Sequence, residues 1–461
     1  MELSLFSDPV FQSFATQRPI ATAAQLILRR LLDPAAIDQV FRDNAELQYE
    51  RTLPFSLVAR TMASVVTGKH KSVHAAYKKL FESIEVSTTA LYNKLQRIEP
   101  QTSRGLVVHS YEQIVAINRQ IGSLASHDVP GYRTRVLDGN HLCNTEHRLA
   151  ETRRLAPGPL PGKSLVVFDP RHEAVCDFFP IEDGHAQERS ALDDVIETLE
   201  RKQLWVADRN FCTLKLMYAI AAAGGCFVIR QHGNLHGSEQ GKLRRIGKSE
   251  TAEVWENRLE LPEYRGQRMT VRRVVAKLFE PTRDKETEVV ILTNLPAEEA
   301  NGVRVSDLYR GRWKIETAFM HMTLSLGCEV RTLCYPPAAL FCFALSLLAY
   351  NSLSVIKAMV KVTHGREQSA MLSHYYLACE LGETTDGLLI ALPEARWSQV
   401  AELPLELYCD QLLSISRAIN MKVYGKSVRG PKKPPPKRTG GRRTTHLSTK
   451  RLLEKRKAKP C

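Results

Sequence analysis

Two short apolar runs in the middle of the chain each lead into an aspartate. Asp138 follows Arg135-Val136-Leu137, and Asp208 follows Leu204-Trp205-Val206-Ala207. The second run has the length and composition of a buried strand, and an acid at the end of a buried strand is not an ordinary solvated group. We therefore expect two strands whose ends bring both carboxylates to one site.

A third acid, Glu316, lies far downstream, and 107 residues separate it from Asp208. We predict one helix over 305–326, in which offsets of three and four residues place Tyr309, Arg312 and Glu316 on one face. The apolar residues of this helix form a stripe that faces the core: Leu308, Ile315, Phe319 and Met322.

Two aspartates and a glutamate that meet in space can hold two divalent metal ions. Carboxylates suit the hard cations Mg²⁺ and Mn²⁺. Such a pair of ions activates a nucleophile and stabilises the leaving oxygen in phosphoryl transfer. The three acids therefore suggest a metal-dependent enzyme that acts on phosphodiesters.

Asp138 has a simpler interpretation and a competitor. Asp138-Gly139 is a pair that is common in hairpin turns. Asp169, in Phe168-Asp169-Pro170, is another acid at the end of an apolar run, although Asp169-Pro170 is itself typical of a turn.

The other two acids also have simpler interpretations. Asp208 could form a salt bridge with Arg209 or Arg230. Glu316 could pair with Arg312 on a helix surface, because the two are four residues apart.

The segment around Glu316 resembles a signature of the DDE transposases of bacterial insertion sequences. Their insertion-sequence-four type carries the pattern Tyr-x2-Arg-x3-Glu-x6-Lys. Tyr309, Arg312 and Glu316 fit this spacing, whereas Thr323 stands where the pattern has lysine.

The surroundings of the two aspartates resemble the same family. Leu137-Asp138-Gly139 and Ala207-Asp208-Arg209-Asn210-Phe211 are similar to its first and second acid motifs, and Leu292-Thr293-Asn294-Leu295 is typical of the segment ahead of the signature. The resemblance covers about residues 50 to 360.

This resemblance implies an α/β fold with a ribonuclease H-like catalytic core and a β-rich insertion. It implies a cut-and-paste DNA transposase, an endonuclease that cleaves transposon ends and joins them to target DNA. Asp138, Asp208 and Glu316 would be catalytic and would hold two Mg²⁺ or Mn²⁺ ions, while Tyr309 and Arg312 would bind DNA phosphates. A homodimer on double-stranded DNA is implied in the same way.

Residues 1–125 are predicted to form a mostly helical, DNA-binding domain. Ser72 and Ser87 are placed to cap two short helices, which suggests a helix-turn-helix element. In that interpretation Lys94 and Arg97 contact DNA phosphates. The alternative is a plain helical bundle with a basic surface.

From about residue 130 the pattern changes to strands and helices, which predicts a mixed sheet. The catalytic domain extends over 130–420, with a β-rich insertion at about 226–298. Strands are expected over 133–138, 164–169, 174–180, 204–208, 226–231, 254–259, 269–278 and 288–292.

The net charge of +14 comes from one end of the chain. From Lys422 to Cys461 there are 15 of the 64 Lys and Arg residues but only one of the 50 acids, so the rest of the chain has 49 of each. We expect residues 421–461 to be a basic, flexible tail, which is attracted to nucleic acid through counterion release.

The cysteines and the apolar segments indicate where in the cell the protein is located. The ten cysteines show no metal-binding or disulfide spacing, and the first residues do not resemble a signal peptide. The apolar segment 338–356 contains serines and an asparagine, which favours a buried core helix over a membrane span. These features predict a cytoplasmic, nucleoid-associated protein with no membrane partner.

Two other function classes stay open. One is a catalytically weak or decayed relative of transposases that binds DNA and acts as an inhibitor, which Thr323 and the basic tail suit. The other is a different nuclease of the same fold, such as a junction-cleaving or repair enzyme. The Tyr-Arg-Glu pattern and the long β-rich segment before it disfavour this second class.

Overall fold

The computed structural model describes residues 5–48, 52–80, 86–154, 156, 158–282, 284–383, 385–426 and 430. Met1–Gly425 form one compact unit and Lys426–Cys461 a second one. The predicted basic tail therefore lies almost wholly outside the described residues. The predicted domain boundaries near residues 125 and 420 stay predictions.

The N-terminal part is helical, and its caps are those that the sequence predicts. The side chains of Ser72 and Ser87 accept bonds from the backbone N–H groups of Ala75 and Ala90. The side chain of Asp33 caps α3 (Pro34–Asn44) in the same way, since it accepts a bond from the N–H of Ala36. The elements are η1 (Leu5–Ser7), α1 (Pro9–Gln17), α2 (Pro19–Leu31), α3 (Pro34–Asn44), α4 (Phe55–Val66), α5 (Val73–Lys79), α6 (Thr88–Leu95) and α7 (Pro100–Gln120).

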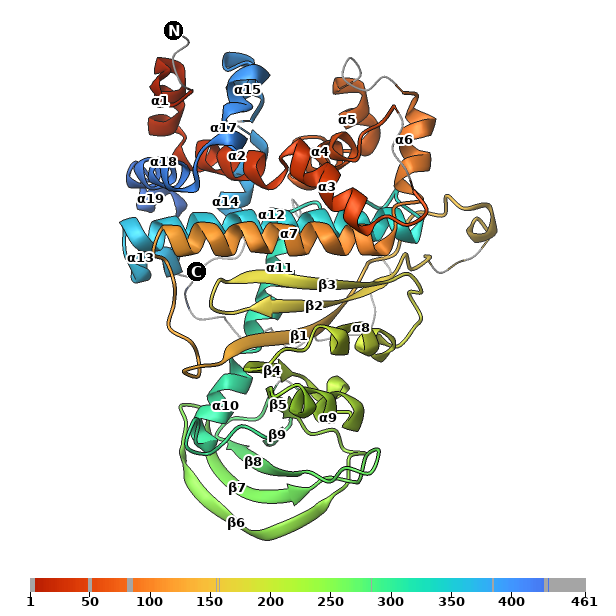
Figure 1. Ribbon diagram of the computed structural model, residues 1–461, viewed down its shortest axis with the longest axis vertical. Coiled ribbons are helices and arrows are strands. Elements are labelled where there is room, and N and C mark those ends of the chain that lie inside the picture. Colours follow the sequence, from red (N-terminus) through yellow and green to blue (C-terminus); the bar gives the residue numbers. More distant parts are fainter. Residues whose placement is uncertain are drawn as a thin grey trace, which may run out of the picture. The chain divides into compact units, whose positions relative to one another are not determined.

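A nine-stranded sheet follows, with the strand order β3-β2-β1-β4-β5-β9-β8-β7-β6 (Figure 1). Strands β1, β4 and β5 are parallel, and all the other neighbours are antiparallel. The bounds are β1 (Arg133–His141), β2 (Lys163–Asp169), β3 (Ala174–Ile181), β4 (Gln203–Ala207), β5 (Cys226–Arg230), β6 (Ser238–Lys248), β7 (Ala252–Glu260), β8 (Thr270–Leu278) and β9 (Glu288–Thr293).

Every strand that the sequence predicts is present, and one strand was missed. β6 is exposed along almost its whole length, so it shows neither an apolar run nor an alternating pattern. Between β3 and β4 lie the turn η4 (Glu188–Ala191) and the short helix α8 (Leu192–Glu197). Two further short elements, η3 (Ala150–Thr152) and η5 (Arg209–Phe211), lie in loops, and α9 (Leu214–Ala222) follows β4.

The sheet separates two apolar cores because neighbouring residues of a strand point to opposite faces. Val136 and Val206 belong to the core shared with α7 and α12 (Pro336–Thr363). Leu137 and Ala207 belong to the core shared with α8 and α9. Figure 1 shows α7 and α12 side by side over the first of these faces.

Helix α12 is long and apolar enough to cross a membrane by length and composition, but 94% of its most apolar window is buried inside the protein. It packs against α7, α2, α4, α18 and β3, as expected of a core helix.

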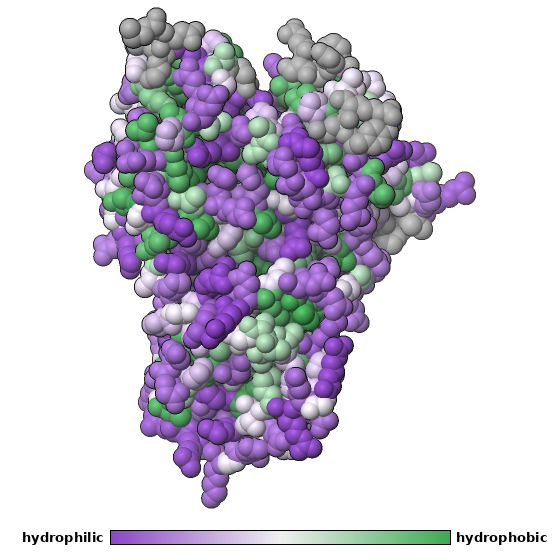
Figure 2. All heavy atoms as spheres, in the orientation of Figure 1, coloured by the Kyte–Doolittle hydropathy of each residue, from purple (hydrophilic) through white to green (hydrophobic). Residues whose placement is uncertain are grey.

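Polar residues cover most of the face of the molecule seen in Figure 2. The remaining helices are α10 (Gly302–Arg310), α11 (Trp313–Ser325), α13 (Arg366–Met371), α14 (His374–Glu383), α15 (Thr385–Ala391), α16 (Glu394–Trp397), α17 (Gln399–Glu402), α18 (Leu405–Arg417) and α19 (Met421–Tyr424).

One buried amide joins α12 to the sheet edge. Asn351 is fully buried, and its side chain accepts a 2.8 Å bond from the backbone N–H of Val175 in β3. Its Nδ2 donates to the carbonyl of Val175 and to the hydroxyl of Ser110 on α7. Asn351 therefore satisfies the backbone of an outer strand that has no further strand beside it.

We expect Asn351→Ala to lower the free energy of unfolding by about 2–4 kcal/mol, because it leaves the buried N–H and carbonyl of Val175 without partners. Chemical denaturation measures this change. Val362→Ala is the matched control, since Val362 is 41% exposed on the same helix and should change the free energy little. Equal effects of the two substitutions would contradict this role of Asn351.

Candidate active site

The two aspartates lie on neighbouring parallel strands. Leu137 of β1 is paired with Ala207 of β4, so the next residues, Asp138 and Asp208, stand at the same level. Strand β1 does not turn after Asp138 but continues to His141. The hairpin interpretation of Asp138-Gly139 is therefore wrong.

Asp208 directly follows β4 and caps the short turn η5, where its Oδ1 accepts a 2.8 Å bond from the N–H of Asn210. The arginines considered as its salt-bridge partners face elsewhere. Arg209 and Arg230 both lie within ion-pair distance of Glu286, at 3.3 and 2.5 Å. In the part of the chain that the structure describes, Asp208 forms no salt bridge with either.

The predicted single helix over 305–326 is wrong. The segment forms two helices, α10 and α11, with Gly311 and Arg312 between them. At the junction the bonds span three residues instead of four, as in the 3.0 Å bond from the N–H of Arg312 to the carbonyl of Tyr309. Glycine is a poor helix former, which explains the interruption. Tyr309 and Glu316 thus lie on different helices, on either side of Arg312.

The predicted apolar stripe is present. Leu308, Ile315 and Met322 are buried, and Phe319 is half-buried against the same core. Trp313, at the start of α11, is 62% exposed. The ring of Trp255 in β7 lies under the ammonium of Lys277 at 4.8 Å.

Arg312 connects the first and third acids. Its Nη1 lies 2.7 Å from Oδ2 of Asp138, and its Nη2 lies 2.6 Å from Oε1 of Glu316. The side chains of Arg312 and Asp138 are only 10% and 15% exposed. The helix-surface pair between Arg312 and Glu316 therefore exists, but the same guanidinium also holds the strand aspartate.

Burial, together with the nearby charges of Asp208 and Glu316, raises the pKa of Asp138 to about 7 in spite of Arg312. Burial alone lowers the pKa of Arg312, but Asp138, Tyr309 and Glu316 outweigh it, so this pKa is raised. Asp208 and Glu316 thus act on Asp138, and the single guanidinium of Arg312 pairs with only two of the three carboxylates. A bound divalent cation would supply further positive charge.

Tyr309 completes the group. Its ring centroid lies 5.9 Å from the guanidinium carbon of Arg312. Burial raises the pKa of its hydroxyl, and the charges of Arg312, Arg230 and Asp208 all act on it. Tyr309 therefore lies near both Asp208 and Arg230, whereas the guanidinium of Arg230 itself pairs with Glu286 and not with Asp208.

The donor set fits a hard divalent cation, since three carboxylates from β1, the end of β4 and α11 converge on one place. As they stand, however, no group of three or more His, Cys, Asp or Glu side chains among the described residues has the geometry of a metal site. The guanidinium of Arg312 lies between two of the three carboxylates, which explains this. Asp138 and Glu316 would together hold a cation only if this guanidinium moved away from them.

Thr323, which stands at the position of the signature lysine, is exposed on α11. Its hydroxyl donates a 3.0 Å bond back to the carbonyl of Phe319 in the same helix. It is too short to replace the reach of a lysine side chain.

Lys94 and Arg97, the predicted phosphate contacts, lie on α6 and just after it, not on the elements that carry the acids. The ammonium of Lys94 stands 4.3 Å from the ring centroid of Phe41, and Arg97 is exposed. The predicted helix-turn-helix is described only in part, because residues 81–85, between α5 and α6, lie outside the described residues.

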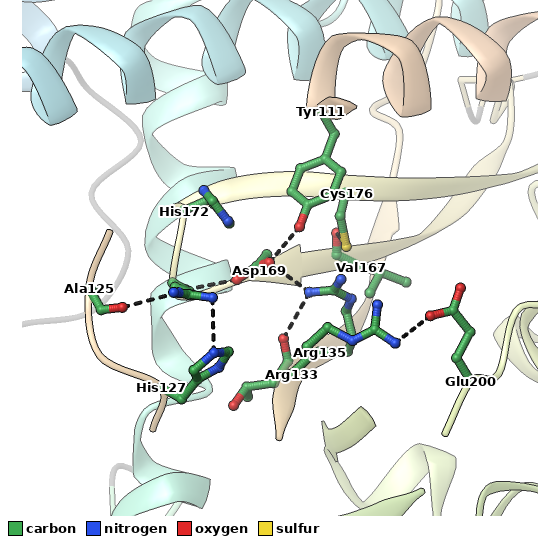
Figure 3. A network of polar contacts seen from close by, with 12 residues as sticks. Tyr111, Ala125, His127, Arg133, Arg135, Val167, Asp169, His172, Cys176 and Glu200 are labelled. Carbon is green, nitrogen blue, oxygen red and sulfur yellow. Dashed lines mark hydrogen bonds and ion pairs between the residues drawn. The ribbon is translucent and has the colours of Figure 1, made fainter. Parts of the chain in front are cut away.

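Asp169, the competitor of Asp138, belongs to a separate buried network (Figure 3). Its Oδ2 accepts bonds from the hydroxyl of Tyr111 at 2.5 Å and from Nη1 of Arg135 at 2.6 Å. Its Oδ1 accepts a bond from the N–H of Arg171. Burial raises the pKa of Asp169, but Arg135 and Tyr111 outweigh it and keep this pKa below its usual value. A carboxylate with this many donors is structural.

Residues 162–352 match the family model of the transposase DDE domain. The matched range includes Asp208 and Glu316 and begins after Asp138. This match supports a transposase of the DDE type. No curated protein sequence matches the chain significantly.

A solved structure of the piggyBac transposase synaptic complex with hairpin DNA aligns with 12% sequence identity. The alignment covers 92% of this chain and 86% of that chain, with a TM-score of 0.38. A similarity this low adds no weight to an assignment of function.

Asp169→Asn should lower the free energy of unfolding at pH 7 by about 3–5 kcal/mol, because it leaves the buried Arg135 without a counter-charge. The folded-state pKa of Asp169 is lowered, so its stabilisation is complete above its unfolded pKa of about 4 and is lost as the pH falls through the folded pKa. The difference between the two proteins should therefore shrink below about pH 4. Denaturation across this pH range tests the trend.

Glu200→Gln is the control for this experiment, since Glu200 pairs with Arg133 at the surface and is 58% exposed. Surface pairs contribute at most about 1 kcal/mol. A pH-independent loss in Asp169→Asn would contradict the assignment of a charged, low-pKa carboxylate.

Arg312→Met should cost about 1–3 kcal/mol of stability without metal, because it leaves two carboxylates without their shared donor. Added Mg²⁺ or Mn²⁺ should restore more stability to this variant than to the wild type, since the cation takes the place of the guanidinium. Thermal unfolding with chelator and with metal measures both effects. Arg310→Met, which removes an exposed arginine, should show no such metal dependence; an equal response in both variants would refute the displacement.

Proposed function

We propose that this protein is a metal-dependent DNA transposase that cleaves transposon ends and joins them to target DNA. The observation that carries the proposal is the convergence of Asp138, Asp208 and Glu316, two of which are bridged by Arg312 at 2.7 and 2.6 Å. The family match over residues 162–352 supports it independently.

A ribonuclease H-like core is part of the proposal. The strand order β3-β2-β1-β4-β5, with β1, β4 and β5 parallel and β2 and β3 antiparallel, supports this assignment. It places Asp138 on the first strand and Asp208 at the end of the fourth. Strand β5 (Cys226–Arg230) lies within the insertion predicted over 226–298 but belongs to the core in this proposal, so that only β6 to β9 form the β-rich insertion ahead of Glu316.

Asp138, Asp208 and Glu316 would hold two Mg²⁺ or Mn²⁺ ions, with Asp138 placed between the other two acids. The ions would supply Lewis-acid activation of the attacking oxygen and stabilisation of the leaving oxygen. The strands fix the two aspartates before substrate arrives, because both belong to one rigid sheet. No protein nucleophile is needed for in-line attack by water or by a DNA 3′-hydroxyl.

Arg312 and Tyr309 would orient the DNA. Released from its two acids, the guanidinium of Arg312 would be able to bind a phosphate through two parallel N–H donors. The hydroxyl of Tyr309 lies close enough to Arg312 to bind the same phosphate. This exchange of partners would couple metal binding to DNA binding.

The DNA partner, the dimeric state and the cellular location complete the proposal. A homodimer on two double-stranded ends would place one site on each end. Lys94 and Arg97 are the proposed contacts of the helical part with DNA. A cytoplasmic, nucleoid-associated protein with no membrane partner fits the burial of α12 inside the protein.

A second candidate is a decayed relative that binds DNA without cutting it. Thr323 in place of lysine and the ion pairs of Arg312 with two acids favour this candidate. Thr323→Lys distinguishes the two: it should strengthen end cleavage in a working enzyme and leave an inactive protein inactive.

The experiment that tests the proposal is cleavage of a labelled duplex that carries the element's own end, with Mg²⁺ or Mn²⁺. Asp138→Ala, Asp208→Ala and Glu316→Ala should each lower the cleavage rate at least about 100-fold, because each removes a metal ligand. Glu200→Ala, at an exposed site, should cleave as the wild type does. End binding without cleavage in either metal would favour the decayed relative instead.

A further inference from the structure

Glu188 lies where the two aspartate-bearing segments meet. It starts the turn η4, and its side chain is 16% exposed. Its Oε2 accepts a 2.5 Å bond from Nδ2 of Asn210, and its Oε1 lies 3.5 Å from Nδ1 of His141. Within the described ranges no lysine or arginine lies at ion-pair distance from it. A largely buried carboxylate without such a partner is costly, which calls for a reason.

Gly139 supplies the first part of that reason. A Cβ at this position would lie 2.3 Å from Cδ and from Oε1 of Glu188. The backbone of Gly139 does not need a glycine, because it lies in β1 and has no positive φ. Position 139 therefore has no room for a side chain, because the carboxylate of Glu188 packs directly on the Cα of Gly139.

Asn210 supplies the second part. Its side chain donates to Glu188, and Nε of Arg189 donates a 2.5 Å bond to its carbonyl. Its N–H is the donor that holds Oδ1 of Asp208 at 2.8 Å. Two residues of turn η4 thus form hydrogen bonds with Asn210. The backbone N–H of Asn210 in turn orients the carboxylate of Asp208.

We infer that Glu188 is a positioning residue, which packs on Gly139 and acts through Asn210 to fix Asp208 beside Asp138 for a shared divalent cation. The inference rests on the proposed function, because a cation is what the two aspartates would share. Groups that orient metal ligands in this way typically account for 10- to 100-fold in metal affinity.

Mn²⁺ binding to the full chain without DNA, measured by electron paramagnetic resonance, tests this role. Glu188→Ala should weaken Mn²⁺ binding about 10- to 100-fold at an unchanged thermal midpoint. Glu188→Gln keeps an oxygen that can accept from Asn210, so it should bind Mn²⁺ nearly as the wild type does. Glu182→Ala, at an exposed acid just beyond β3, is the matched control and should have no effect.

Gly139→Ala probes the same contact from the other side, because its methyl group displaces the carboxylate of Glu188. It should weaken Mn²⁺ binding as Glu188→Ala does. The double variant should be no weaker than either single variant, since the methyl group then fills the space that the carboxylate leaves. Losses that add in the double variant would overturn the inference.

The remaining outcomes separate this inference from the proposed function. If Asp208→Ala abolishes Mn²⁺ binding but Glu188→Ala binds as the wild type does, Glu188 has no positioning role and the proposed function stands. Equal losses in Glu188→Ala and Glu188→Gln would overturn the route through Asn210. A wild type that binds no Mn²⁺ would refute both. If Glu188→Ala does not fold, Asn210→Ala removes the same bond and must show the same loss.

Discussion

The parallel pairing of β1 with β4 is the constraint on which the rest of the site depends. Because Leu137 lies opposite Ala207, the two aspartates that follow stand side by side. A shift of one residue in this register would turn one carboxylate to the other face of the sheet. The apolar residues on both faces prevent that shift, since Val136 and Leu137 belong to different cores. Packing of apolar side chains on both faces of the sheet thus determines the positions of the two aspartates.

Charge balance is the second constraint. The carboxylates of Asp138, Asp208 and Glu316 lie close together in a partly buried place. The guanidinium of Arg312 offsets part of their negative charge. Arg312 serves two acids from the junction of α10 and α11, where its guanidinium contacts Asp138 of β1 and Glu316 of α11.

Local patterns predicted much of the fold, and the failures have physical causes. Ser72 and Ser87 were recognisable because a cap depends on one side chain and the residues next to it. Asp208 was recognisable because an acid ends an apolar run. The break at Gly311 was not, because the apolar stripe from Leu308 to Met322 keeps helical spacing across it. The role of Glu188 was also hidden, because it depends on Gly139 and Asn210, which are distant in sequence.

Strands β6 to β9, which form the proposed insertion, extend the same sheet that carries Asp138. Strand β9 pairs directly with β5, and β8, β7 and β6 follow in the same sheet. With strands about 4.8 Å apart, four steps separate β5 from β6 by roughly 19 Å measured along the sheet. Each neighbouring pair of strands along this path is hydrogen-bonded. The outer strand β6 is therefore connected to the strands that carry the aspartates by backbone hydrogen bonds through β7, β8, β9 and β5.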